Sequence, residues 1–78
     1  MYYVYILRCS NGSYYTGCTG NLKERFESHQ QGQVISTRDK LPVTLVNYIA
    51  FKEKSKAFKF EKYLKSGSGI AFRNRHFL

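Results

Sequence analysis

The sequence predicts an α+β domain with a small sheet and the element order β-β-α-β-α-α. The pair Asn11–Gly12 separates two short β-rich runs, which is the pattern of a β-hairpin. Two later stretches combine helix-capping residues with helical periodicity, and a run rich in Val, Ile, Tyr and Phe lies between them. A chain of 78 residues is expected to form a single domain, residues 1–78.

The first half of the chain predicts two strands and a helix. The first strand is expected at Met1–Arg8, a β-branched and aromatic run, and the second near Ser13–Gly17. A helix is expected over Leu22–Gln31, because Asn21 can cap its first turn and Glu24 can complete a capping box.

The second half predicts one strand and two helices. Residues 33–40 carry no periodicity and are expected to form a polar loop, and a third strand is expected over Pro42–Phe51. Ser55 is the expected cap of a second helix that ends at Gly67. Ser68 would then cap a short last helix over the stretch IAFRNRHF.

The hairpin has two alternative registers, and they place its tyrosines differently. A two-residue turn at Asn11–Gly12 would leave Tyr5 and Tyr15 on opposite faces. A three-residue loop with Gly12 in the left-handed bulge conformation would put both on one face, with Tyr5 opposite Gly17.

The charge and cysteine content narrow the class of partner. Thirteen Lys and Arg against five Asp and Glu give a formal charge of +8, which favours nucleic acid first and an anionic membrane surface second. The apolar run at the N-terminus is too short to span a membrane and lacks a signal peptide's basic opening, so a cytoplasmic protein is expected. Cys9 and Cys18 lack zinc-site spacing and are expected to be reduced and mostly buried.

Polar residues occupy positions where helical periodicity predicts core. The inward stripe that starts at Leu22 includes Arg25 and His29, and the stripe that starts at Ala57 includes Glu61. Each has an ordinary alternative: an arginine extended along the core edge, a satisfied histidine, a glutamate paired with lysines. A small core accommodates few buried charges, since each unpaired one costs several kcal/mol, so convergence of the three on one site is the preferred interpretation. The two tyrosines could likewise be plain core aromatics.

Four short stretches, VYI, YTG, NLKERFESH and EKYLK, follow one another in this order along the chain. Together with the tail LKSGSGIAFRNRHF, they resemble the GIY-YIG nuclease superfamily, in particular its small stand-alone bacterial members. The resemblance implies a three-stranded antiparallel sheet flanked by helices. It also implies hydrolysis of DNA phosphodiester bonds with one divalent ion, Mg²⁺ or Mn²⁺.

The resemblance also implies roles for five residues. Tyr5 and Tyr15 would be the signature tyrosines, Arg25 would bind the scissile phosphate, His29 would lie one helical turn beyond it, and Glu61 would be the metal ligand. Tyr5 is the candidate general base. Because a free tyrosine has a pKa of about 10, this role requires nearby positive charge to lower it. In the alternative, His29 accepts the tyrosine proton.

Basic residues outside these positions are expected to contact DNA phosphates without reading sequence, so binding should be weak and salt-sensitive. They are Arg8, Lys23, Arg38, Lys40, Lys65, Arg73 and Arg75. The leading hypothesis is a metal-dependent endonuclease, structure-selective in repair or recombination, with a protein partner for targeting as an open question. The alternatives are a non-catalytic nucleic-acid-binding module and, with least support, an adaptor protein.

Overall fold

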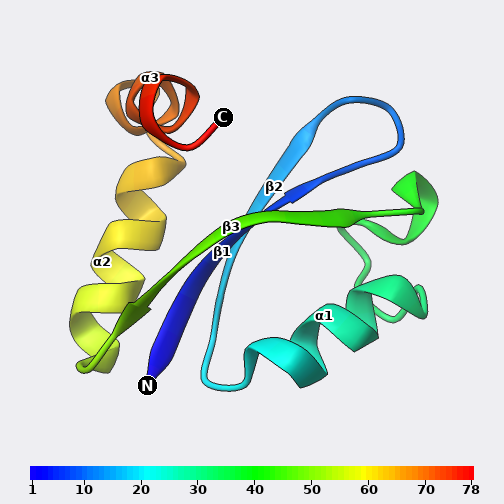
Figure 1. The fold of residues 1–78 in the computed structure, drawn as a ribbon, viewed down its shortest axis with the longest axis horizontal. Helices are drawn as coiled ribbons and strands as arrows, with labels where there is room; N and C mark the ends of the chain where they lie inside the picture. Colours follow the sequence, from blue (N-terminus) through cyan, green and yellow to red (C-terminus); the bar gives the residue numbers. More distant parts are fainter.

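Three antiparallel strands form a central sheet, and three α-helices flank it in a computed structural model that describes residues 1–78 (Figure 1). The order is β-β-α-β-α-α, so the predicted α+β fold is confirmed. The elements are β1 (Tyr2–Arg8), β2 (Tyr14–Thr19), α1 (Leu22–Gln30), the short 3₁₀ helix η1 (Arg38–Lys40), β3 (Thr44–Phe51), α2 (Lys54–Leu64) and α3 (Gly67–His76).

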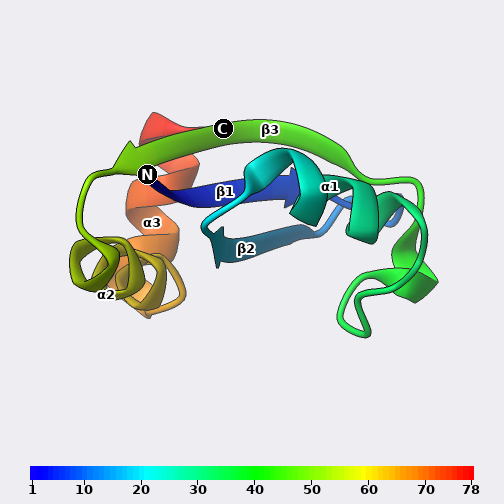
Figure 2. The ribbon, with the colours of Figure 1, turned by 90° about the horizontal axis from the view of Figure 1, so that it is seen from below.

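The strand order is β2-β1-β3, so β1 is the central strand, and it is also the most buried one. Seen along the sheet edge, α1 lies toward one end of the twisted sheet and the α2–α3 pair toward the other (Figure 2). Two small hydrophobic clusters result. One is centred on Tyr5 and Leu7 and includes Phe26 of α1, and the other is centred on Val4 and is closed by Ala57 and Leu64 of α2.

The hairpin between β1 and β2 adopts the three-residue loop. Tyr5 pairs with Gly17 and Leu7 with Tyr15, so both tyrosines lie on the same face of the sheet. Gly12 has φ +84°, and its N–H donates to the carbonyl of Cys9 at 3.0 Å. A side chain at this φ would be strained, which explains why glycine occupies the bulge. The register with the tyrosines on one face is therefore confirmed, and the two-residue turn is wrong.

The first helix begins where the sequence predicted, and its cap differs in one detail. The Asn21 side-chain oxygen accepts from the backbone N–H of Glu24 at 3.1 Å, as an N-cap should. The Glu24 carboxylate does not return to the backbone of Asn21 but accepts from its side-chain amide at 3.3 Å. The Asn21 N–H donates instead to Thr19 Oγ1 at 3.1 Å, so the reciprocal half of the capping box is wrong.

The predicted boundary between the last two helices is also wrong. Lys54 already begins α2, which has no side-chain cap, so Ser55 lies inside the helix. Gly67 begins α3 instead of ending α2, and the cap of α3 is Ser66 rather than Ser68, with Ser66 Oγ accepting from the Gly69 N–H at 3.2 Å. A Cβ on Gly69 would overlap the carbonyl of Tyr63, so the glycine allows the two helices to meet at a tight corner.

Smaller differences occur at the strands and the loop. The second strand runs to Thr19, beyond the predicted end at Gly17, and β3 begins at Thr44 instead of Pro42. The stretch 33–40 was predicted as a plain loop, but it ends in η1, which lies beside the hairpin, where the carbonyl of Lys40 accepts from the N–H of Ser10 at 2.9 Å (Figure 1).

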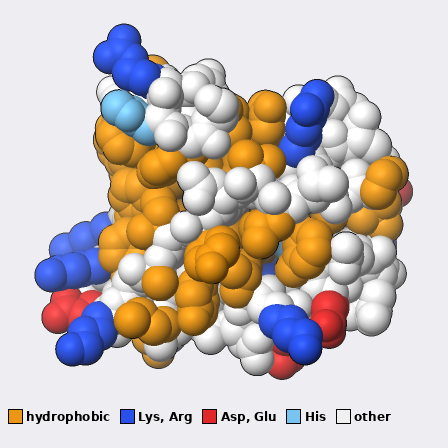
Figure 3. Space-filling model, viewed as in Figure 1, with side chains coloured by type: hydrophobic (Ala, Val, Ile, Leu, Met, Phe, Trp, Pro, Cys, Tyr) orange, Lys and Arg blue, Asp and Glu red, His pale blue; other side chains and the backbone are white.

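One face of the molecule carries hydrophobic side chains along its middle, with Lys and Arg side chains mostly toward its periphery (Figure 3). Between α1 and β3 a groove of about 440 Å³ is lined in part by Tyr3, Phe26, Leu45 and Tyr48. None of the helices has the length and apolar character needed to cross a membrane.

Candidate active site

Tyr5, Tyr15 and His29 form one cluster of three rings. Tyr5 comes from the central strand, Tyr15 from β2 and His29 from the last turn of α1. The ring centroids are 6.3 Å apart for the two tyrosines, 5.6 Å for Tyr5 and His29, and 5.1 Å for Tyr15 and His29. The two candidate tyrosines therefore lie beside His29, one of the three polar residues that the sequence predicted to converge.

Gly17 creates the space that Tyr5 occupies. Because Gly17 lies directly across from Tyr5, a Cβ there would overlap the Cζ and hydroxyl of the tyrosine and lie 2.9 Å from its Cε1. The Tyr5 hydroxyl therefore lies against the backbone of β2. This contact limits the position of the ring on the side of β2.

A chain of two hydrogen bonds extends from Tyr5 into the protein. The Tyr5 hydroxyl and His29 Nε2 are 2.8 Å apart, and His29 Nδ1 and Thr37 Oγ1 are 2.7 Å apart. Tyr5 is 1% exposed, and His29 and Thr37 are 0% exposed. Thr37 lies in the stretch predicted as a polar loop and was missed. The only sequence signal was that a buried histidine needs two partners, and this signal does not say which residue supplies the second.

Burial has the largest effect on the pKa values of Tyr5 and His29. It raises the pKa of Tyr5 to about 12, and the opposing interaction with Arg25 is smaller. Arg25 does act to lower this pKa, as the general-base role requires, but in the isolated protein burial outweighs its effect. Burial, with a smaller contribution from Arg25, lowers the pKa of His29 below 6.5, so the ring is neutral at pH 7.

Arg25 lies at the solvent boundary beside the cluster. It is exposed, which corrects the expectation of a buried position on the α1 stripe. The pKa of Arg25 is raised, chiefly by the Tyr5 hydroxyl and also by Tyr15, so its guanidinium is close to both, although no hydrogen bond of ordinary geometry joins them. It also lines a small polar cleft with Thr19 and Asn21. Its donors are therefore free for an anionic ligand.

Glu61 approaches the same region from α2. Its negative charge contributes to the raised pKa values of Tyr5 and Cys18, so it lies near β1 and β2. The side chain is 20% exposed and forms an ion pair with Lys65 at 3.3 Å. Of Arg25, His29 and Glu61, only the neutral His29 is fully buried. The cost of burying an unpaired charge therefore gives no reason for Arg25 and Glu61 to converge.

Glu61 alone could bind only a metal ion whose other ligands are water and substrate phosphate. No three His, Cys, Asp or Glu side chains lie close enough together to hold an ion. Mg²⁺ commonly uses one or two carboxylates, with water and substrate phosphate completing its shell. A single accessible carboxylate at Glu61 is compatible with that mode, and it does not fit a closed structural zinc site.

The predicted basic contacts divide by position. Lys65 Nζ lies 6.0 Å above the Tyr15 ring, and the Arg73 guanidinium lies 5.1 Å above the Tyr14 ring. Both line a cleft of about 240 Å³ with Tyr14 and Tyr15, so the structure brings them to the cluster.

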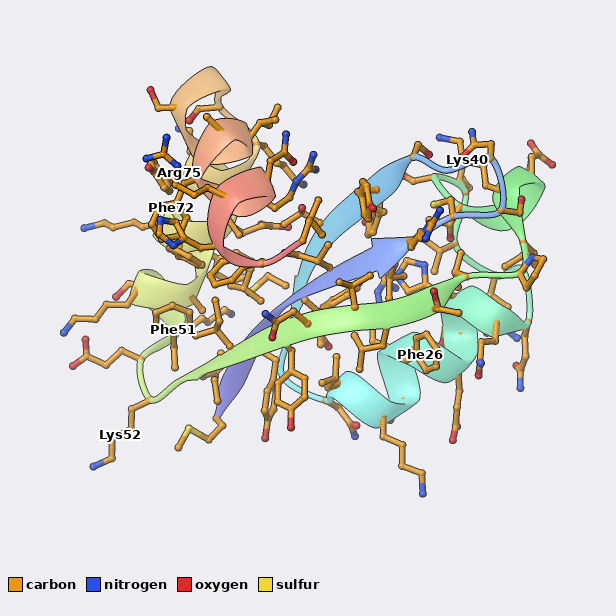
Figure 4. The ribbon with its side chains drawn as sticks, turned by 45° about the horizontal axis from the view of Figure 1, so that its top comes forward. Phe26, Lys40, Phe51, Lys52, Phe72 and Arg75 are labelled. Atoms are coloured by element: carbon orange, nitrogen blue, oxygen red, sulfur yellow. The ribbon has the colours of Figure 1, made fainter.

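The other five predicted contacts are distributed over several elements. Arg8 ends β1, Lys23 lines the groove beside α1, and Arg38 and Lys40 form part of η1. Arg75 lines a separate cleft on α3. Figure 4 shows Lys40 and Arg75 at opposite ends of the molecule, so these residues do not form one patch.

Comparison with known proteins decides the family. The family model described as the GIY-YIG catalytic domain matches residues 1–71. The chain belongs to the GIY-YIG family. Proteins with this domain are generally nucleases, which agrees with the resemblance noted in the sequence.

Small GIY-YIG proteins from several organisms are similar to this chain. A UPF0213 protein of Cupriavidus pinatubonensis is 40% identical over 75 residues, covering 91% of this chain and 83% of the relative. A UPF0213 protein of Clostridium perfringens is 44% identical over 66 residues, covering 83% of this chain and 71% of the relative. The solution NMR structure of a UPF0213 protein from Bacillus halodurans superposes with a TM-score of 0.61 at 34% identity, covering 99% of this chain and 87% of that one.

Proposed function

We propose that this GIY-YIG chain is a single-domain, divalent-metal-dependent endonuclease that hydrolyses phosphodiester bonds in DNA. The observation that carries the proposal is the convergence of Tyr5, Tyr15 and His29 beside an exposed, unpaired Arg25. Family membership supports nuclease chemistry in general, and the geometry supports a site for a scissile phosphate beside the tyrosines.

Arg25 would bind the phosphate. Its planar guanidinium can donate two parallel hydrogen bonds to non-bridging oxygens and stabilise the negative charge that builds up on them in the transition state. Tyr15 is only partly buried and its hydroxyl lies close to Arg25, so it can donate to the same phosphate. These two residues would hold the phosphorus next to the Tyr5 hydroxyl.

Tyr5 would act as the general base. It would accept a proton from a water molecule as the water oxygen bonds to phosphorus and the bond to the 3′ oxygen breaks. The pKa of about 12 in the isolated protein disfavours the phenolate, so positive charge in the site must offset both the burial and the negative charge of the bound phosphate. Arg25 is the permanent charge next to the hydroxyl, and it already opposes the effect of burial.

Glu61 would hold one Mg²⁺ or Mn²⁺ ion, which would supply Lewis-acid stabilisation of the leaving oxygen. Lys65 now pairs with this carboxylate at 3.3 Å. A cation and the Lys65 ammonium would therefore compete for the Glu61 carboxylate, and Lys65 can turn to a phosphate instead.

The basic residues would position DNA through its backbone. Lys65 and Arg73, in the cleft beside Tyr15, would contact phosphates next to the cleaved bond. Arg8, Lys23, Arg38, Lys40 and Arg75 would contact more distant phosphates. Branched or nicked DNA in repair or recombination is the proposed substrate, in the cytoplasm.

The test compares cleavage of duplex, nicked and branched DNA by the wild type and by Glu61→Gln in Mg²⁺ or Mn²⁺. Loss of an electrostatic contact to the transition state typically lowers kcat by about 10²–10³-fold, and a loss of this size is expected. Glu53→Gln is the matched control, because Glu53 is an exposed carboxylate that pairs only with Lys56 at the start of α2. Equal rates for the wild type and Glu61→Gln would contradict the assignment.

Binding without cleavage would support the alternative function. If the wild type binds all three DNAs but cuts none in either metal, the chain is a nucleic-acid-binding module with a nuclease fold. Arg25→Lys separates the two functions further. Lysine keeps the charge and most of the affinity but lacks the forked geometry, so cleavage should fall more than binding.

A further inference from the structure

Thr37, His29 and Tyr5 carry more hydrogens than their two hydrogen bonds can use. At pH 7 each hydroxyl has one hydrogen and the neutral imidazole has one N–H, which makes three donors for two bonds. One hydrogen must therefore point elsewhere, and it belongs either to Thr37 or to Tyr5. The tautomer of His29 decides which.

If Tyr5 donates to His29 Nε2, then His29 Nδ1–H donates to Thr37 and the Thr37 hydrogen is left over. Thr37 is 0% exposed, and its hydroxyl contacts no acceptor other than His29. A buried hydroxyl hydrogen without an acceptor costs about 1–3 kcal/mol. This arrangement is therefore penalised in the interior of the protein.

In the opposite arrangement, Thr37 donates to His29 Nδ1 and His29 Nε2–H donates to the Tyr5 oxygen. The hydrogen left over now belongs to Tyr5, whose hydroxyl lies beside Arg25 and Tyr15. Tyr5 is 1% exposed and its hydroxyl pairs only with His29, but it lies beside the exposed Arg25, where a water or phosphate oxygen that enters the candidate site can accept this hydrogen. The unused hydrogen then lies at the edge of the candidate site instead of beside the fully buried Thr37, which favours this arrangement.

We infer that Thr37 is a positioning residue that holds His29 in the Nε2–H tautomer, so that His29 donates to the Tyr5 oxygen and stabilises it as a phenolate. This inference rests on the proposed function where it concerns catalysis. It also decides whether His29 accepts the proton of Tyr5 or donates a hydrogen bond to its oxygen. Nε2 already carries a hydrogen, so His29 cannot accept the Tyr5 proton, which leaves to solvent before the phenolate takes a proton from the attacking water.

The tautomer can be measured directly by ¹⁵N NMR of the labelled wild type at pH 7, without DNA or metal. The ¹⁵N shifts of His29 distinguish a protonated Nε2 from a protonated Nδ1. The Nε2–H form is expected, and a predominant Nδ1–H form would overturn the inference. Because this readout needs no activity, it decides the tautomer even if the chain cuts no DNA.

The catalytic consequence is tested with Thr37→Val and Thr37→Ser. Valine keeps the shape but removes the donor, and it should slow cleavage about tenfold or more, a part of what a general base contributes. Serine keeps the hydroxyl and should restore the rate. The wild-type rate should also rise about tenfold per pH unit through neutral pH, because the phenolate fraction does. A plateau above the pKa of His29, or a Thr37→Val variant with wild-type kinetics, would refute the role.

Discussion

At the scale of single residues, the position of the candidate base Tyr5 depends on Gly17, which has no side chain. Tyr5 and Tyr15 share a face because the Gly12 bulge sets the register, and Tyr5 reaches β2 because Gly17 has no Cβ. The hydroxyl of Tyr5 thus lies between a backbone wall and His29. A small change at Gly17 should therefore alter the site without touching any charged group.

Gly17→Ala is the corresponding prediction. The new methyl group would overlap the Tyr5 ring, which is 1% exposed and has little room to move. Overpacking of this kind costs about 1–3 kcal/mol of the free energy of unfolding, and the displaced hydroxyl should also reduce cleavage. Chemical denaturation and the cleavage assay measure the two effects.

Gly20→Ala is the matched control for this substitution. A Cβ at Gly20 would meet nothing closer than a Tyr2 ring carbon at 3.7 Å, which is an ordinary contact. Near wild-type stability is expected. If Gly17→Ala and Gly20→Ala behave alike, the close contact at Tyr5 does not constrain the ring.

The sequence predicted the site residues better than their environments. Turn chemistry and strand alternation are local, so they limited the hairpin to two registers, one of which puts both tyrosines on one face. The neutral, buried state of His29 and its contact with Thr37 could not be placed, because the path of residues 33–40 depends on tertiary packing. Periodicity also put Arg25 on the buried stripe, but a long side chain on a small domain can turn to solvent.

At the scale of elements, α2 and α3 behave as one unit. The sequence SGSG was predicted to end one helix and cap the next one residue later, yet the corner is tighter, with Ser66 as the cap. The reason is the close approach of Gly69 to the carbonyl of Tyr63, a tertiary contact that local capping rules do not report. Aromatic contacts of Phe72 with Phe60 and Phe77 stabilise the packing of α3 against α2.

Gly69→Ala should separate the two helices. A methyl group there would collide with backbone, which cannot rotate away as a side chain can. The expected loss is at the upper end of the overpacking range, about 3 kcal/mol, with a shift of α3 that moves Arg73 away from Tyr14. Thermal unfolding followed by circular dichroism measures the loss.

The glycine two positions earlier provides the control. A Cβ on Gly67 meets nothing within 4 Å, and the residue lies in the first turn of α3. Gly67→Ala should therefore be neutral or slightly stabilising, because alanine favours the helix. Equal effects of the two substitutions would show that the close approach of Gly69 to the carbonyl of Tyr63 does not constrain the corner between α2 and α3.

At the scale of the whole molecule, the charge was predictable and its distribution was not. The excess of eight positive charges follows from composition alone. The positions of Arg73 and Arg75 show why the charge distribution was not predictable. They are two residues apart on α3 and therefore lie on different faces. Arg73 lies over the Tyr14 ring, and Arg75 lines a separate cleft. Which of them lies near the site depends on the rotation of α3 against α2, and no local pattern in the sequence fixes that rotation.

The salt dependence of DNA binding tests this distribution. Each phosphate that a basic side chain neutralises steepens the slope of log K against log salt by about 0.9 for duplex DNA. Arg73→Gln should therefore make the slope shallower by about 0.9, because Arg73 lies in the cleft beside Tyr15. Lys52→Gln removes the same charge at the turn between β3 and α2, at a residue that is not among the proposed contacts. Figure 4 shows Lys52 apart from Lys40 and Arg75, two of those contacts. Lys52→Gln should leave the slope unchanged. Equal slopes for the two variants would mean that DNA responds to net charge alone, and that the cleft beside Tyr15 does not orient the backbone.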